Sequence, residues 1–95
     1  MGIIGLSPGN GHPYSWAAIC NGYDAQAMAN CGFPSIPDYL ARRSWPEDQL
    51  VGARVTHIWT QDSVESYKIA QASLIDNVVD RPEDMIGEID ALLLA

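Results

Sequence analysis

A glycine-rich segment near the N-terminus carries the clearest chemical signal in the sequence. Gly5, Gly9 and Gly11 lie in the run GLSPGNG, directly after a short apolar stretch. Glycines let a backbone turn tightly and let phosphate oxygens approach closely, and the N–H groups of a following helix favour an anion. The match to G-x-G-x-x-G is imperfect, because Ser7 and Asn10 occupy the positions of the second and third glycines. The segment predicts a pyrophosphate-binding loop, and a simple connection between strand and helix is the alternative.

Two catalytic motifs overlap the same run. The segment from Gly5 to Gly9 fits G-x-S-x-G, the nucleophile elbow of α/β-hydrolases. In that elbow the residue after the serine donates its backbone N–H to the oxyanion hole, and here that residue is Pro8, which has no N–H. The missing N–H argues against a hydrolase. The P-loop motif is absent too, because no lysine follows the glycines.

Three polar residues, Thr60, Gln61 and Asp62, follow a second β-rich segment, where dinucleotide-binding folds place their ribose contacts. Asp62 has Glu65 three residues later, a capping-box pattern, so we favour a helix cap over a ribose ligand for Asp62. If Thr60 and Gln61 face the ribose, the missing carboxylate leaves NADP as suitable as NAD. No arginine lies beside them to pair with a 2′-phosphate, so both cofactors stay open.

The histidines and cysteines offer little further chemistry. His12 directly follows the glycines, so it is a candidate for contact with a cofactor phosphate or a substrate, with a loop-stabilising role as the alternative. No C-x-x-C or H-x-x-x-H spacing occurs among the two histidines, His12 and His57, and the two cysteines, Cys20 and Cys31. We therefore expect no metal site.

The elements that must position these residues alternate between strands and helices. Apolar or β-rich segments predict strands at about 2–6, 53–60, 77–80 and 90–95. Caps, glycine stops and helical spacing predict helices over about 15–21, 24–28, 62–75 and 80–89. The expected buried sides are Trp16, Ile19 and Cys20; then Val64, Ala72 and Ile75; then Met85, Ile86 and Ile89. This order predicts an α/β fold, a Rossmann-like three-layer half with a parallel sheet and helices on its faces.

Composition narrows the class of partner and the setting. The chain has a net charge of −7, which disfavours nucleic acid and acidic membrane surfaces as partners. No apolar run approaches the ~20 residues of a membrane span, and no signal peptide is recognisable. With only two cysteines, a reduced, cytoplasmic setting is the expectation.

The chain reads as a single partial domain over residues 1–95, with an irregular insertion at about 33–52 that contains short helical pieces. It ends on the apolar run LLLA. A final strand of this kind leaves a sticky edge, so we expect either more chain or a partner to cover it, including a second copy in a homo-oligomer.

Three stretches, GIIGLSPGNGHPYSW, ARVTHIWTQD and NVVDRPEDMIGEIDALLLA, resemble the Gfo/Idh/MocA oxidoreductases. The resemblance covers the front of such an enzyme and implies a Rossmann domain that binds NAD or NADP. It further implies hydride transfer to or from a sugar, a polyol or a related substrate, held by a second domain that this chain lacks. The family's catalytic lysine lies in a Glu-Lys-Pro motif, which is also absent here, so we expect no turnover by this segment alone.

By position, the resemblance assigns cofactor contacts to nine residues: Gly5, Ser7, Gly9, Asn10, Gly11, His12, Thr60, Gln61 and Asp62. It assigns no catalytic residue and no metal ligand. A second hypothesis belongs to another class of protein, a non-catalytic Rossmann-like scaffold or assembly module that pairs through its exposed last strand.

Overall fold

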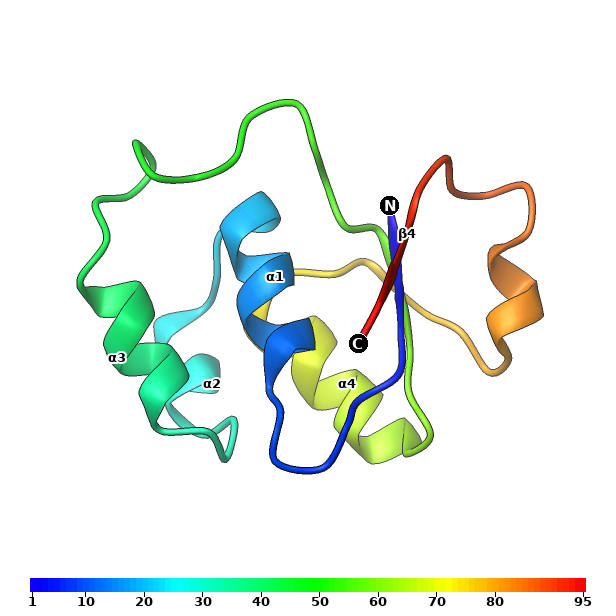
Figure 1. The fold of residues 1–95 in the computed structure, drawn as a ribbon, viewed down its shortest axis with the longest axis horizontal. Coiled ribbons are helices and arrows are strands. Elements are labelled where there is room, and N and C mark those ends of the chain that lie inside the picture. The colour runs from blue at the N-terminus through cyan, green and yellow to red at the C-terminus, as the bar shows by residue number, and fades with distance from the viewer.

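The structure is a computed structural model that describes residues 1–95. Its elements are shown in Figure 1: β1 (Gly2–Ile4), α1 (His12–Asn21), α2 (Ala25–Ala29), α3 (Ser35–Ala41), β2 (His57–Trp59), α4 (Ser63–Ala72), β3 (Asn77–Val78), the 3-10 turn η1 (Pro82–Met85) and β4 (Leu92–Leu94). No helix combines the length and the hydropathy that a membrane span requires.

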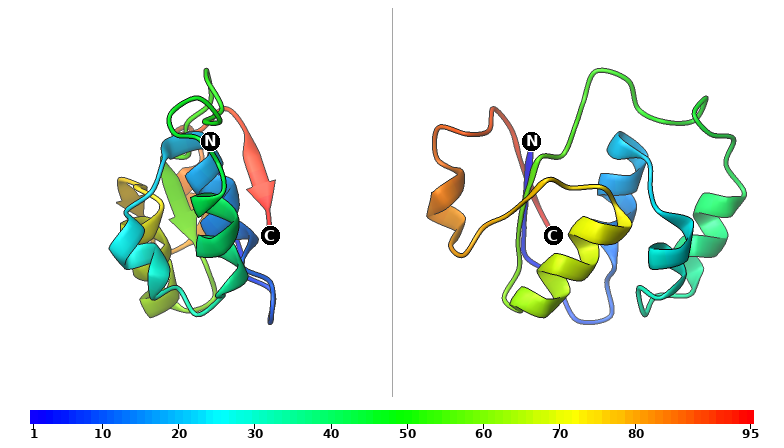
Figure 2. Two further views of the ribbon diagram at one scale, coloured as in Figure 1. Left: turned by 90° about the vertical axis from the view of Figure 1, so that its left-hand side faces the viewer. Right: turned by 180° about the vertical axis from the view of Figure 1, so that it is seen from behind.

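The four strands form one parallel sheet in the order β3-β2-β1-β4. In the central strand, Ile3 is in register with Ile58 of β2 on one side and with Leu93 of β4 on the other. Figures 1 and 2 show α1 and α4 over one face of the sheet and η1 over the other. The predicted α/β class is confirmed, and the strand order is compatible with a Rossmann-like half.

The core lies between the sheet and the two long helices. Ile3, Ile58 and Ile69 of α4 are fully buried in one apolar cluster. α4 turns Ser66, Ile69 and Ala72 inward, and the prediction that Val64 is buried is wrong, because its side chain is 67% exposed.

The buried side of α1 also differs from the prediction. The helix buries Tyr14, Ala17, Ala18 and Asn21, and it also buries Cys20, as predicted. Trp16 and Ile19, by contrast, stay half-buried. Small alanine side chains let the helix backbone lie close to the sheet. The larger apolar residues therefore face sideways, toward α3.

Local signals set the helix ends. α1 begins at His12 rather than near Ser15, and Pro13 lies in its first turn, where the fixed φ of proline suits a helix and no N–H is needed. Gly22 ends α1 with φ +82°. Asp24 caps α2 by accepting from the N–H of Ala27, as its position predicted.

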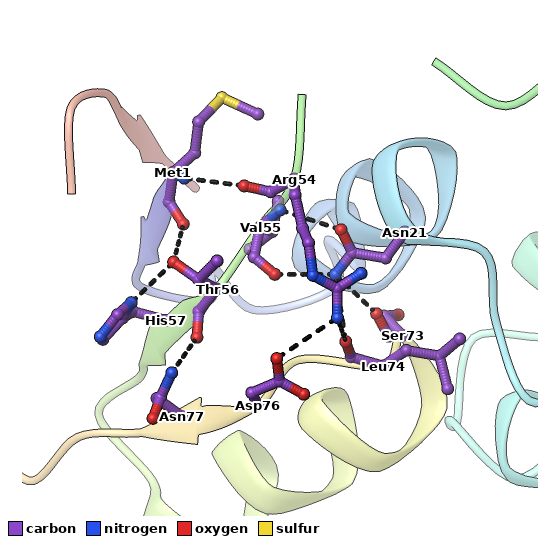
Figure 3. Close-up of polar contacts among 10 residues, drawn as sticks. All are labelled: Met1, Asn21, Arg54, Val55, Thr56, His57, Ser73, Leu74, Asp76 and Asn77. Carbon is purple, nitrogen blue, oxygen red and sulfur yellow. Dashed lines mark hydrogen bonds and ion pairs between the residues drawn. The ribbon is translucent and has the colours of Figure 1, made fainter. Parts of the chain in front are cut away.

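A buried asparagine joins three segments at the amino end of the sheet (Figure 3). The side chain of Asn21 accepts from the N–H of Val55 at 2.9 Å and donates to the carbonyl oxygens of Val55 and Ser73 at 2.8 and 3.1 Å. Because both backbone groups of Val55 bond to this side chain, the second strand starts at His57 and is shorter than predicted.

The two weakly predicted segments are only partly regular. The insertion contains α3, and turns occupy most of 42–52. The helix predicted from Asp80 is wrong beyond one turn: η1 stops at Met85, and Gly87 has φ +82°, outside the helical region. Met85 is buried, but Ile86 is 80% exposed. The face of the sheet opposite α1 and α4 is therefore only partly covered.

Candidate functional site

The glycine loop, residues 5–11, lies at the carboxyl end of β1. β2 and β3, which follow β1 in the chain, lie on one side of β1 in the sheet, and β4 lies on its other side. The loop after β1 therefore lies at the point where the strand order reverses. Parallel α/β sheets bind their ligands at this place. Gly5 has φ +92°, and a Cβ on it would fall 2.8 Å from the carbonyl oxygen of Ala95. A glycine is therefore required where the loop leaves the sheet.

Three backbone N–H groups of the loop are free. Asn10 donates its N–H to Ser7, and its side-chain oxygen accepts from the N–H of His12 at 3.0 Å. The N–H groups of Ser7, Gly9 and Gly11 donate no hydrogen bond within the protein. Gly9 is exposed with φ +74°, and nothing lies within 4 Å of the position of its Cβ. Ser7 and Gly9 are exposed, whereas Gly11 is buried, so the loop can offer the N–H groups of Ser7 and Gly9 to an anion.

The first turn of α1 contributes less to such a site than its position predicts. Pro13 has no N–H, and the N–H groups of Tyr14 and Ser15 both donate to the carbonyl oxygen of Gly11. Asn10 already accepts from His12. An anion would therefore be held by the loop rather than by the end of the helix.

Gly11 serves packing as well as the loop. Its φ is an ordinary −91°, but a Cβ would fall 2.9 Å from Cγ of Phe33 and closer still to Cδ1 of Ile36. The start of α3 thus lies directly against the end of the glycine loop. This contact could not be predicted from the sequence, in which the 33–52 stretch shows only a weak pattern.

The three residues after β2 have different environments. Thr60 is buried, and its hydroxyl bonds to Ser66 Oγ and to the carbonyl oxygen of Asp62, both at 2.7 Å. A ribose could not reach it without displacing these partners, so we leave Thr60 out of the candidate contacts.

Asp62 caps α4 by accepting from the N–H of Val64 at 2.9 Å, which confirms the cap. The other half of the predicted capping box is wrong, because Glu65 bonds to Tyr14 instead of returning to Asp62. Gln61 is exposed, and its Oε1 accepts from the N–H of Leu6 at 3.1 Å. Gln61 therefore ties the glycine loop to the end of β2 and leaves its amide nitrogen free.

His12 lies at the end of the loop, exposed to solvent. Its ring stacks on Trp16 with 4.6 Å between ring centroids and 13° between planes. No side chain or backbone group hydrogen-bonds to its ring, so the stack with Trp16 is what orients the imidazole.

A pair of titratable groups, the buried Tyr14 and the half-buried Glu65, lies behind the loop. The hydroxyl of Tyr14 donates to Glu65 Oε1 at 2.7 Å, and Lys68 lies 3.9 Å from the other oxygen of Glu65. Burial raises the pKa of Tyr14 well above the usual tyrosine range, and the bond to Glu65 and its charge raise it further. Tyr14 therefore stays a neutral donor. Sequence reasoning did not identify this pair, because its members lie on different helices.

Nothing else in the structure forms a recognisable reactive centre. No group of three or more His, Cys, Asp or Glu side chains is placed to hold a metal ion. Comparisons of the chain with protein-family models, curated proteins and solved structures found no match.

Proposed function

We propose that the chain is the nicotinamide dinucleotide-binding part of an oxidoreductase, with NAD or NADP bound at the glycine loop. The observation that carries the proposal is the loop's position: it joins the central strand to α1 at the reversal of strand order, and three of its N–H groups are free. The resemblance to the Gfo/Idh/MocA enzymes adds hydride transfer with a sugar or polyol, the substrate being held by a domain outside this chain.

The residues around the loop fit a dinucleotide in part. The exposed N–H groups of Ser7 and Gly9 would hold the phosphates, because free backbone donors suit oxyanions. The free amide of Gln61 and the second carboxylate oxygen of Asp62 would face the ribose. The bound nicotinamide would supply the hydride acceptor or donor, and this chain's own residues bind and orient it.

The proposal is tested by titrating the chain with NADH and with NADPH by calorimetry, using two matched valine variants. Gly9 and Gly32 both have positive φ, +74° and +88°, and open space around the Cβ position. Both substitutions therefore strain the backbone alike, but only Gly9→Val places a side chain at the proposed site.

We expect the unmodified chain and Gly32→Val to bind with similar affinity, and Gly9→Val to bind at least about tenfold more weakly, a loss of about 1.4 kcal/mol. Circular dichroism checks that both variants fold. Equal affinities in all three proteins, or no binding by the unmodified chain, would contradict the proposal.

A second candidate function, assembly through β4, is favoured by a specific observation. β4 is an edge strand, and Leu92 and Leu94 are 46% and 70% exposed. Their outward N–H and C=O groups can pair with the same strand of a second copy.

Sedimentation of the chain over a range of concentrations tests this candidate. Association that Leu94→Lys abolishes would support it, provided that Leu50→Lys, at a leucine that is 51% exposed elsewhere, leaves association intact. A monomer at every concentration would contradict assembly and leave the dinucleotide proposal unaffected.

A further inference from the structure

A groove runs along the outer side of α1, between this helix and α3. Its volume is about 680 Å³, within the range of roughly 300–1,000 Å³ that small-molecule sites occupy. His12, Ser15 and Trp16 form one wall, and Ile36 and Tyr39 form the other. Gly9, Asn10 and Gly11 of the glycine loop line one end of the groove. Gln61 and Asp62 do not line it, so the groove extends away from the proposed ribose contacts.

The walls present aromatic surfaces in fixed positions. The His12–Trp16 stack is preformed, and the exposed His12 ring makes no hydrogen bond that a ligand would have to break. Tyr39 is 41% exposed on the facing helix. Planar rings bind such surfaces by offset or face-to-face stacking.

The charge around this groove is unlike that of the rest of the chain. The sequence has 12 acidic and five basic residues, yet no acidic residue lines the groove. Three of the basic side chains pair with carboxylates, and the two that do not are Arg42 and Arg43 at the end of α3. The guanidinium of Arg43 lies 4.7 Å from the centroid of the Tyr39 ring. The Tyr39 ring therefore lies between the groove and the positive charge of Arg43.

We propose that this groove is a second small-molecule site, which takes a planar aromatic anion. The ring lies between the His12–Trp16 pair and Tyr39, and the carboxylate or phosphate points toward Arg43. This site meets the proposed dinucleotide site at Gly9 and Gly11, but its aromatic walls and its cation belong to α3 and the side of α1, so the two proposals can be tested separately.

The test compares nicotinate with nicotinamide on the 15N-labelled full chain by NMR. The two probes share one ring, but only nicotinate carries a charge. The indole N–H of Trp59 donates to the carbonyl oxygen of Asp80, away from the groove, and serves as an internal control. We expect the Trp16 indole to shift and the Trp59 indole to stay in place. We expect nicotinate to bind up to about fivefold more tightly than nicotinamide, the weight of one exposed charge pair.

Arg43→Gln should remove the preference for nicotinate, whereas Arg54→Gln, a matched change at the other end of the sheet, should keep it. The same comparison of AMP with adenosine tests a phosphate in place of a carboxylate. The charged probe whose affinity exceeds that of its uncharged counterpart by the larger factor identifies the anionic group. Equal affinity for charged and neutral probes, shifts confined to the glycine loop, or no binding of any probe would overturn the proposal. Loss of the nicotinate preference in Arg43→Gln with dinucleotide binding intact would separate the two sites.

Discussion

Replacing Asn21 by alanine should strongly destabilise the fold, because the side chain satisfies buried backbone groups that have no other partner. Asn21 is 7% exposed, and Val55 and Ser73 are fully buried. The change leaves the N–H and C=O of Val55 and the C=O of Ser73 without their hydrogen bonds (Figure 3).

The expected loss follows from the cost of each unsatisfied group. With about 2 kcal/mol for the N–H and about 1 kcal/mol for each carbonyl, the free energy of unfolding falls by about 4 kcal/mol. A domain of this size has roughly 5–14 kcal/mol in total, so the variant would be marginal.

Urea denaturation with linear extrapolation measures this loss, and Asn30→Ala is the matched control. The amide of Asn30 makes one exposed bond, to the carbonyl oxygen of Gln26, so its removal should cost less than about 0.5 kcal/mol. If Asn21→Ala cost no more than this control, the asparagine would not hold the three segments together and the reasoning would fail.

Two further predictions concern residues near the loop. Gly11→Ala should destabilise the chain by about 1–3 kcal/mol through overpacking, and the double variant with Ile36→Ala should recover part of this loss in the same denaturation assay; strictly additive effects would count against the contact. Tyr14→Phe should cost about 1 kcal/mol at neutral pH by removing the bond to Glu65. Because folding raises the pKa of Tyr14, the unfolded chain loses this proton first, and stability should fall as pH rises above about 10. The phenylalanine variant should show a smaller alkaline decline, because the Cys20 thiol, whose pKa burial also raises, still contributes to it. An unchanged slope would refute the assignment.

The elements that could be predicted from the sequence are those set by local signals. Asp24 and Asp62 cap their helices through backbone N–H groups two or three residues away, and Gly22 ends α1 with a positive φ. Each signal lies within one turn of the boundary that it defines. Alternation of strands and helices then limits the fold to a parallel sheet.

The features that could not be predicted from the sequence depend on contacts between distant segments. Thr60 looked like a ribose ligand because of its position, but the hydroxyl of Ser66 holds it in the core. Trp16 is more apolar than Ala17 or Ala18, yet close packing against the sheet favours the smaller residues. The bond between Tyr14 and Glu65 and the groove beside α3 require a tertiary arrangement that periodicity does not specify.

The place of β1 in the sheet has a consequence for the order of folding. β1 is formed by residues 2–4 but is a central strand, and its neighbours come from residues 57–59 and 92–94. During synthesis β1 stays unpaired until residues 57–59 have been made, and its second edge stays open until residues 92–94 have been made. Such distant pairings close large loops and slow folding. Until they form, the unpaired N–H and C=O groups of β1 are open to pairing with the wrong strand.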